Sequence, residues 1–366
     1  MITSLKINYR ELSDNSYKDK YIPQNALFHQ ACSMTEYLRK ALIFWTDDTE
    51  LENTAMHLIL DDKKEIGRSY MYGGKVKAGA TINKVQCLFA LEACEQYRNE
   101  GVGTSLLLYP LINKEYDFVL IAGMTSMVLP AYRKLKYHIF EIPQYIKLQN
   151  ARYILIPLGF KGCVLKVLTS IINHIINLVS IPNKLKNKKL NKKFVLKKVD
   201  IVPEWAGELA TNDGHKYMEL HDRRWLQWCL DNNTNGFEND IQSFYTVFDK
   251  NNNPLGFFMT KERFITEAGR IKNSIRGTVV EWGSYDESIL SESMINTMAL
   301  QTFTKNVDLI VTLAGNSETS KALKKMGFIQ RGIHSIGFRD KKSVFKDVGD
   351  QNLWRLRYGY TNTIIY

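Results

Sequence analysis

The chain has 366 residues, so it exceeds the size of one ordinary hydrophobic core and predicts two domains. Hydrophobic residues make up 45% of it and charged residues 24%, a globular balance that excludes an intrinsically disordered chain. The net charge of +11 invites a nucleic-acid-binding function, but most of it comes from eight lysines between Pro182 and Lys198, where no acid stands. Such a block is typical of a solvated segment, so we expect no nucleic-acid partner.

The beginning of the sequence and its cysteines indicate where the protein works. Met1 is followed by a polar, mixed-charge stretch in which no secretory signal is visible. Five cysteines, an odd number, show no CxxC spacing, which favours a reducing compartment and gives no metal site. We therefore expect a cytoplasmic protein that binds no metal.

The first part of the chain predicts an α/β unit. A hairpin of strands at Met56–Leu60 and Ile66–Tyr72 comes first, and a longer strand at Val85–Ala93 follows it. A helix, a buried strand, a short helix and a last strand complete the unit, at Thr104–Asn113, Phe118–Ala122, around Tyr132 and from Tyr137. Strands that alternate with helices after an opening hairpin imply a mixed sheet flanked by helices.

Gly162–Ile181 predicts an amphipathic helix after this unit. Polar residues recur along it with helical spacing and interrupt the apolar stretch, so it does not resemble a bilayer-spanning helix of roughly 20 mainly apolar residues. Such a helix followed by the lysine run suits peripheral membrane binding through residues 162–198, at the inner face of a membrane. Because apolar helical stripes are more often core, a helix packed against both domains, with the lysine run as a linker, is the first interpretation.

The second half of the chain repeats the layout of the first. Gly67 in the first hairpin has its counterpart in Gly256, and Glu92 on the long strand has its counterpart in Glu281. Two further pairs of segments, which begin at Asp117 and Asp308 and at Tyr132 and Leu323, keep nearly the same offset in sequence. The chain is therefore predicted to contain two copies of one α/β unit.

A glycine loop, QYRNEGVGTSLL, stands between the long strand and the helix of the first copy. No lysine follows Gly103, which excludes a Walker loop, and Leu106 replaces the third glycine of a dinucleotide-binding loop. Gly101 and Gly103 have no Cβ, so successive backbone N–H groups can close around an anion. The N-terminus of the next helix adds unsatisfied amides, and Arg98 adds a charge-assisted contact.

This loop resembles the pyrophosphate loop of the GNAT acyltransferase superfamily, Q/R-x-x-G-x-G/A, at Arg98, Gly101 and Gly103. The resemblance covers about residues 55–142 and 243–338. It implies an α/β protein of two tandem GNAT-like domains, each a mixed, mostly antiparallel sheet flanked by helices. The expected boundaries are 1–150 for the domain with the acyl-CoA loop, 151–198 for a helical basic linker, and 199–366 for the second domain.

The two copies depart from the family pattern in different places. A later family motif like Y-x-K-x-G-F is matched at Tyr132–Lys134, but Lys136 and Tyr137 stand where Gly-Phe is usual. The second copy keeps Gly327–Phe328 but has SYDESILSES in place of the glycine loop. Carboxylates there repel a pyrophosphate, so we expect the second copy to bind no coenzyme A.

Resemblance to GNAT enzymes implies direct transfer from acetyl-CoA. The thioester carbonyl is expected against Leu91 and Ala93, where a backbone N–H polarises it, with Glu92 as general base and Tyr132 as the acid that protonates the departing thiolate. A structural role for Glu92 stays open, because Glu281 stands at the matching position in the copy without the loop. The implied coenzyme A contacts in the loop are Arg98, Asn99, Glu100, Gly101, Val102, Gly103 and Thr104.

The function implied by the resemblance is transfer of an acetyl group from acetyl-CoA to an amine or a hydroxyl. The sequence does not specify the acceptor, and an amino sugar or nucleotide sugar is the class we expect. Tandem GNAT folds also serve N-myristoyl transfer and aminoacyl transfer to peptidoglycan precursors, so a long-chain acyl or aminoacyl transferase stays open. The alternative from another class is a non-catalytic binding or scaffold protein with two decayed GNAT domains.

Overall fold

The computed structural model describes residues 2–14, 51–62, 64–97, 99–212, 214–231, 240–268 and 271–359. The first half contains β1 (Ile2–Asn8), α1 (Tyr9–Asp14), β2 (Thr54–Asp61), β3 (Lys64–Ala78), β4 (Thr81–Ala93), η3 (Glu95–Tyr97), α4 (Val102–Ile112), β5 (Phe118–Ala122), α5 (Leu129–Lys134) and β6 (His138–Leu148). The rest contains α6 (Arg152–Leu155), α7 (Gly162–Val179), α8 (Ile181–Lys193), β7 (Val195–Val199), α9 (Glu204–Thr211), β8 (Tyr217–Glu219), α10 (Arg223–Asp231), β9 (Ile241–Phe248), β10 (Pro254–Ala268), β11 (Ile271–Ser284), α11 (Glu292–Ala299), β12 (Leu309–Leu313), α12 (Ser317–Lys325), β13 (Ile329–Asp340) and η4 (Gln351–Leu353).

The order of elements recurs along the chain, as the sequence repeat predicts. The run β2–β3–β4–α4–β5–α5–β6 reappears as β9–β10–β11–α11–β12–α12–β13. The predicted buried strands Phe118–Ala122 and Leu309–Leu313 coincide with β5 and β12, and every residue of both is buried. The predicted mixed α/β architecture is therefore confirmed, with parallel pairs at β4–β5 and β11–β12 and antiparallel pairs elsewhere.

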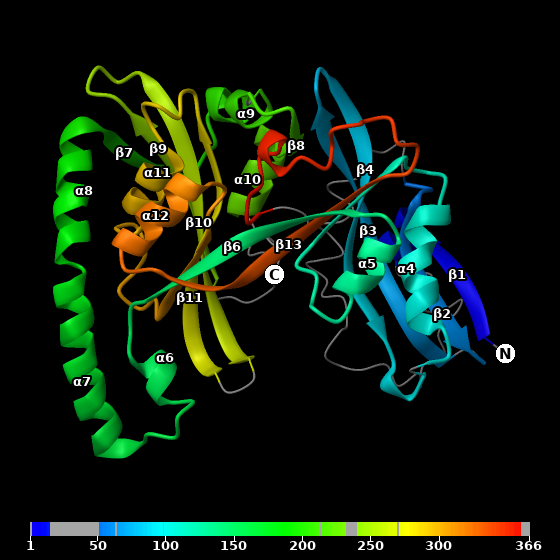
Figure 1. Cartoon of the computed structure of the whole chain (residues 1–366), viewed down its shortest axis with the longest axis horizontal. Coiled ribbons are helices and arrows are strands. Elements are labelled where there is room, and N and C mark those ends of the chain that lie inside the picture. The colour runs from blue at the N-terminus through cyan, green and yellow to red at the C-terminus, as the bar shows by residue number, and fades with distance from the viewer. Residues whose placement is uncertain are drawn as a thin grey trace.

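The strands form one sheet, and this corrects the expectation of a separate sheet for each copy. The order is β1-β2-β3-β4-β5-β13-β6-β12-β11-β10-β9-β7, with β8 paired to β3. The last strands of the two copies are exchanged, because β13 pairs with β5 and β6 pairs with β12 (Figure 1). The exchange joins the halves by main-chain hydrogen bonds and leaves no open sheet edge between them. The boundary set at residue 150 stays a prediction, since strands cross between the copies.

The helices divide between the two faces of this sheet. On one face α4 and α5 cover a core that includes Met71, Leu88 and Tyr109. On the other face the largest core joins residues from both halves and takes in the apolar sides of α9 and α10, for example Leu209 and Leu226. This shared core and the exchanged strands hold the two copies in one body.

Residues 151–198, which connect the two copies, differ from the expected helix packed against both domains and lysine-rich linker. The lysine run forms α8 and the edge strand β7, which pairs antiparallel with β9, so it is not a linker between separate sheets. The expected packing of the preceding helix against both domains is wrong, since no residue of α7 is buried. Within the described ranges, α7 is a helix with the length and apolar content that a bilayer crossing requires. It stands with α8 at the outer edge of the molecule (Figure 1).

The cap of α5 explains how a lysine replaces the glycine of the family motif. The N–H of Tyr137 donates to the carbonyl of Tyr132 at 3.1 Å, and the N–H of Lys136 donates to that of Arg133 at 3.0 Å. This paired arrangement closes a helix end and requires a left-handed residue. Lys136 has φ +60°, and Gly327, in the same place after α12, has φ +80°. Lys136 therefore adopts the left-handed backbone conformation that the glycine of the motif adopts, and its Cβ makes this conformation strained.

We expect Lys136→Gly to stabilise the protein by about 1 kcal/mol, because glycine adopts left-handed φ without the steric cost of a Cβ. The free energy of unfolding in urea measures the change. The matched control is Lys134→Gly at the last residue of α5, which has helical conformation and is expected to lose up to about 1 kcal/mol. A Lys136→Gly midpoint at or below that of the wild type contradicts the strain assigned to this residue.

Candidate functional site

Strands β4 and β5 run parallel and then separate. Their pairing ends at Leu88 opposite Ile121, while β4 continues to Ala93. On its other side β4 is irregular against β3, where the register shifts between Arg68 and Tyr70. A bulge bends its strand and increases the local twist, which turns β4 away from β5. In the described sheet, the edge of β4 beyond Leu88 has no strand partner on the β5 side.

A cavity of about 230 Å³ opens where these strands separate. Its wall combines β3, β4, α4, the end of β5 with the turn after it, and α5, through Ser69, Leu88, Leu91, Leu106, Ile121, Ala122, Gly123, Met124, Thr125, Val128 and Tyr132. The lining is mostly apolar, with hydroxyl groups from Ser69, Thr125 and Tyr132. Sequence reasoning found Leu91 and Tyr132 and missed the others. A turn directly after a buried parallel strand is the signal that locates Gly123 to Thr125.

The N-terminus of α4 lies beside this cavity and offers free donors. Its N-cap, Gly101, has φ +81° and makes no side-chain cap. Within the described residues, the backbone N–H groups of Val102, Gly103 and Thr104 donate to no acceptor, and the first bond of the helix is Ser105 to the Gly101 carbonyl at 2.9 Å. The first N–H groups of a helix lack internal acceptors and attract anions.

The space over this helix end also fits an anion. A Cβ built on Gly101 or on Gly103 meets no atom of the described residues within 4 Å, so these residues leave the region above the loop open. Beneath it, a Cβ on Gly67 of β3 would lie 2.6 Å from Val102 Cγ1 and 3.3 Å from the Glu92 carbonyl oxygen. Glycine at position 67 therefore lets the buried Val102 rest directly on the sheet, which fixes the height of the helix N-terminus.

The structure brings some of the predicted site residues together and separates others. Leu91 and Tyr132 line the cavity, whereas Ala93 is exposed at the end of β4. In the loop, Asn99 and Glu100 are exposed next to the free donors, and Asn99 has φ +74°. Arg98 lies outside the described residues. The contacts assigned to these side chains stay predictions.

Glu92 does not line the cavity. Leu91 faces the cavity, and neighbouring side chains on a strand point to opposite faces, so Glu92 faces the other side of the sheet. Its carboxylate lies 3.6 Å from Arg68 Nε, and Arg68 Nη1 also lies 3.4 Å from Glu65 Oε1. This ion pair gives Glu92 a structural partner, so its role as general base stays a prediction.

Tyr132 is held in one place at the cavity wall. Its ring is buried and meets Tyr137 edge to face, with centroids 4.9 Å apart. Its carbonyl takes part in the α5 cap described above. Burial raises the pKa of the Tyr132 hydroxyl above its ordinary value, so the phenol keeps its proton at neutral pH. A proton donor must begin protonated, so the Tyr132 hydroxyl is in the required state, although the raised pKa makes it a weaker acid than an ordinary phenol.

The corresponding place in the second copy is filled by a carboxyl group. Glu292, buried at the start of α11, accepts from the Gly315 N–H at 3.3 Å and bonds the Thr319 hydroxyl at 2.7 Å. The N-cap Ser291 also accepts from the Met294 N–H. The donors that remain free on α4 are thus partly occupied on α11, and the side chain of Glu292 bridges α11 to the turn after β12. These contacts favour the expectation that the second copy binds no coenzyme A.

The pKa of Glu292 makes this bridge sensitive to pH. Burial raises the pKa from 4.5 to about 7, against the opposing effect of the Thr319 and Gly315 hydrogen bonds. Because the folded-state pKa exceeds the unfolded one, the unfolded state loses its proton first. The stability from the neutral acid is complete below pH 4.5 and is lost as the pH rises to about 7.

We expect Glu292→Gln to remove this loss, since the amide stays neutral and reproduces both hydrogen bonds. The variant should match the wild type near pH 4.5 and exceed it by about 1–3 kcal/mol at pH 8. Thermal unfolding at several pH values measures the difference. A difference between the two proteins that does not change with pH excludes titration of Glu292 as the cause.

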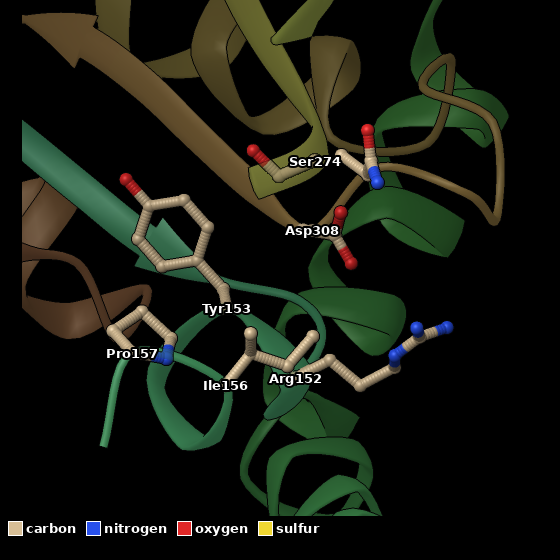
Figure 2. A pocket seen from close by; sticks show the side chains of 7 residues that line it. Arg152, Tyr153, Ile156, Pro157, Ser274 and Asp308 are labelled. Atoms are coloured by element: carbon tan, nitrogen blue, oxygen red, sulfur yellow. The ribbon is translucent and has the colours of Figure 1, made fainter. Parts of the chain in front are cut away.

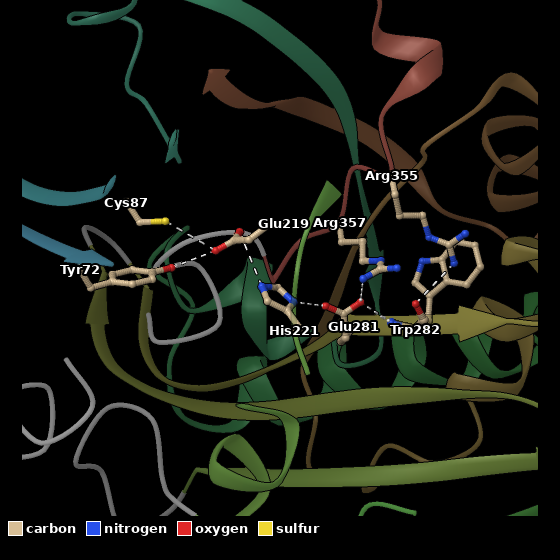
Figure 3. A network of polar contacts seen from close by, with 8 residues as sticks. All are labelled: Tyr72, Cys87, Glu219, His221, Glu281, Trp282, Arg355 and Arg357. Atoms are coloured by element: carbon tan, nitrogen blue, oxygen red, sulfur yellow. Dashed lines mark hydrogen bonds and ion pairs between the residues drawn. The ribbon is translucent and has the colours of Figure 1, made fainter. Parts of the chain in front are cut away.

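A buried network of charges lies in the core shared by the two halves (Figure 3). His221 contacts Glu281 through Nδ1 and lies 3.6 Å from Glu219 through Nε2, while Arg357 Nη1 lies 2.8 Å from Glu281. Tyr72 donates to Glu219 at 3.1 Å. Burial alone would lower the His221 pKa, but the two carboxylates outweigh it and raise the pKa to about 9. The charged imidazole balances the carboxylates, which gives Glu281 a structural role.

The cysteines near the cavity do not supply a nucleophile. Burial raises the pKa of the Cys87 thiol well above its ordinary value, and the nearby Glu219 raises it further. Burial also raises the pKa of Cys94, which lies between β4 and the loop. A thiol reacts through its thiolate, so neither group is activated as a nucleophile.

A second cavity, between α6 and the start of β11, is too small for a nucleotide (Figure 2). Its volume is about 30 Å³, and Tyr153, Ser274 and Asp308 contribute to its wall. Such a volume holds little more than a water molecule. Among the described residues there is no group of three or more His, Cys, Asp or Glu side chains arranged to bind a metal ion.

Comparisons with known proteins found similar solved structures but no similar sequences among protein families or curated proteins. No protein-family model matches the sequence, and no curated protein matches it. The structure is similar to Saccharomyces cerevisiae N-myristoyltransferase with a TM-score of 0.55 and 10% identity, over 93% of this chain and 82% of that one. A GCN5-related N-acetyltransferase from Anabaena variabilis matches with a TM-score of 0.53 and 11% identity, over 93% and 73%. Eis1 from Mycobacterium abscessus matches with a TM-score of 0.50 and 10% identity, over 93% and 74%.

Proposed function

We propose that this chain, which has the GNAT fold, is an acyltransferase that takes its acyl group from acyl-coenzyme A. The observation that carries the proposal is the N-terminus of α4, which has no side-chain cap and lies one turn before Leu106, a residue that lines the cavity between β4 and β5. The N–H groups of Val102, Gly103 and Thr104, which have no acceptor among the described residues, suit a pyrophosphate, and the apolar cavity suits the thioester end. The yeast N-myristoyltransferase with this fold contains bound myristoyl-CoA.

Each part of the site has a task in this function. The loop and helix end hold the diphosphate, which orients the remainder of the donor along the gap between the strands. Backbone N–H groups of β4 beyond Leu88, where the pairing with β5 ends, polarise the thioester carbonyl as negative charge develops on it. When an acceptor amine attacks the thioester carbonyl, the C–S bond breaks and the acyl group passes to nitrogen. Tyr132 gives its proton to the departing thiolate, and the proton that the nitrogen loses passes through solvent and restores the Tyr132 hydroxyl.

We propose that the transferred acyl group is short, and acetyl is the first candidate. The cavity of about 230 Å³ is below the roughly 300–1,000 Å³ of typical ligand pockets. It suits the end of the pantetheine arm with a small acyl group better than the same arm with a long aliphatic chain. The likeness to N-myristoyltransferase keeps a long-chain donor as the second candidate, and a series of acyl-CoA thioesters from acetyl to palmitoyl separates the two.

The proposed acceptor is an amine or a hydroxyl, and amino sugars and nucleotide sugars come first among candidates. An assay of free thiol release from acetyl-CoA, with amino sugars, polyamines and peptides as acceptors, tests this class. Acceptor-dependent thiol release, with a mass shift of one acetyl group on the acceptor, supports the proposal. Release from palmitoyl-CoA but not from acetyl-CoA supports the long-chain candidate instead.

Coenzyme A binding, measured by calorimetry, decides between an enzyme and a scaffold. We expect a single binding site per chain, because the matching place in the second copy is occupied by Glu292. A chain that binds neither coenzyme A nor acetyl-CoA overturns the proposal. In that case the non-catalytic binding or scaffold function, or an aminoacyl transferase that does not use coenzyme A, takes its place.

A further inference from the structure

An apolar stripe on the outside of α7 and α8 is exposed and is covered by no other segment that the structure describes. It consists of exposed side chains at intervals of mostly three and four residues, namely Val164, Val167, Ile171, Ile175, Leu178, Val179, Ile181 and Leu185. Ile171, in its middle, is 53% exposed, and Leu185, at its end, is 58% exposed. Helical spacing puts these residues on one face. Single exposed apolar residues are common on proteins, but a continuous row along a helix marks an interaction surface.

The orientation of α7 makes this exposure a property of the fold. The polar residue Asn173 faces inward, where its Oδ1 accepts from the Ala151 N–H at 2.8 Å and its Nδ2 donates to Asn150 Oδ1 at 3.3 Å. At the far end, Asn183 of α8 is buried and donates to the Met326 carbonyl at 2.8 Å. These contacts bind the polar side of the helix pair to the molecule and direct its apolar side to the surroundings.

Positive charge lies next to the stripe. Residues 162–198 contain no acid, and the contact between Asn183 and Met326 sets the C-terminal end of α12 beside α8. We define the lysine cluster as the exposed lysines of α8 and α12, namely Lys184, Lys188, Lys189, Lys192, Lys193, Lys321, Lys324 and Lys325. An apolar stripe beside a lysine cluster is complementary to a surface that is apolar inside and anionic at its boundary.

We infer that α7 and α8 form a peripheral docking surface for an anionic lipid bilayer. The stripe enters the boundary between headgroups and acyl chains while the lysine cluster meets the anionic headgroups. A folded surface for a nucleic acid would present basic and aromatic side chains, and it has no use for a row of aliphatic ones. The inference does not depend on the proposed acyl transfer.

The docking helix lies in the plane of the bilayer. A crossing by α7, which has the length for it, would have to release the Asn173 contacts and carry Lys166, Asn173 and Asn177 into hydrocarbon. In-plane binding leaves these contacts intact and uses only side chains that are already exposed. Both halves of the molecule then stay on one side of the membrane.

Co-sedimentation of the full chain with vesicles tests the inference. We expect binding to phosphatidylcholine vesicles that contain about 30% phosphatidylserine, and a loss of most binding between about 0.05 M and 0.5 M salt, because salt screens the lysine contribution. The double variant Ile171→Gln/Ile175→Gln should bind at least tenfold more weakly. Its matched control, Ile82→Gln/Ile112→Gln, alters two exposed isoleucines of the first half and should bind as the wild type does.

A charge variant tests the lysine cluster separately. Lys188→Gln/Lys189→Gln/Lys192→Gln should lower the partition coefficient about 100-fold, since each lysine near an anionic surface contributes roughly 1 kcal/mol. Lys114→Gln/Lys134→Gln/Lys305→Gln, with the same change of charge on exposed lysines elsewhere, is the control. Equal loss in both triple variants shows a net-charge effect and overturns the docking surface.

Three other outcomes also overturn the inference. The first is absence of vesicle binding by the wild type at low salt. The second is retention in cell membranes after alkaline carbonate extraction, which releases peripheral proteins and leaves spanning ones. The third is binding to single-stranded RNA in place of vesicles, reduced by the lysine variant and unaffected by the isoleucine variant.

Discussion

The Gly103→Glu variant is expected to bind coenzyme A at least 100-fold more weakly than the wild type. Gly103 lies in the first turn of α4, and a Cβ there meets no neighbouring atom, so a glutamate side chain is accommodated without distortion. Its carboxylate then stands in the space over the free N–H groups, where it repels the diphosphate by roughly 4 kcal/mol for each charge pair at about 4 Å. Isothermal calorimetry with coenzyme A measures the dissociation constant.

Gly103→Gln is the matched control, because glutamine has the same size as glutamate and no charge. We expect Gly103→Gln to retain most of the affinity and both variants to unfold at the temperature of the wild type. High salt should recover part of the affinity of Gly103→Glu, since screening weakens charge repulsion. If the two variants bind coenzyme A equally, the pyrophosphate does not lie at the N-terminus of α4.

The Tyr132→Phe variant is expected to lower kcat about 100- to 10,000-fold with little change in KM, the range for loss of a general acid. Phenylalanine keeps the packing of the ring against Tyr137 and the cap of α5, since both use atoms other than the hydroxyl. Steady-state thiol release from acetyl-CoA measures both constants. The dissociation constant for coenzyme A should stay within about twofold of the wild type, because no diphosphate contact is assigned to this residue.

The dependence on the leaving group separates a proton donor from a packing residue. A thioester whose thiol has a low pKa needs less protonation as it leaves, so Tyr132→Phe should lose less activity with it than with acetyl-CoA. Tyr137→Phe is the control, since its ring packs against Tyr132 but does not line the cavity. An equal loss of kcat in Tyr132→Phe for both thioesters contradicts the role of general acid.

The sequence was sufficient for the repeat and for the order of elements. Gly67 and Gly256 could be matched because both permit close packing on the sheet: a Cβ on Gly256 would lie 2.8 Å from Leu290 Cδ2, as one on Gly67 would lie 2.6 Å from Val102. The exchange of β6 and β13 could not be predicted. The apolar pattern of a strand specifies which of its faces is buried but not which strand lies beside it.

The site was predictable to a similar extent. The glycine loop could be found because Gly101 and Gly103, as glycines, indicate a backbone that needs positive φ or the absence of a Cβ, and this can be seen in the local sequence. The position of the cavity wall depends on where β4 separates from β5. That point is set by the register shift between β3 and β4, and no residue type in the sequence indicates such a shift. The same register shift determines which side chain lies opposite Glu92, so the ion pair between Glu92 and Arg68 could not be predicted from the sequence.

The strand exchange has a consequence for the growing chain on the ribosome. The partner of β5 is β13, so the main-chain groups of Phe118 to Ala122 that face it find their acceptors and donors only when residues 336–340 have been made. Until then β5 is an unpaired edge strand in the half that carries the glycine loop, and such an edge can associate with other nascent chains. Formation of the cavity wall, which includes Ile121 and Ala122, is thereby coupled to synthesis of β13 in the second copy.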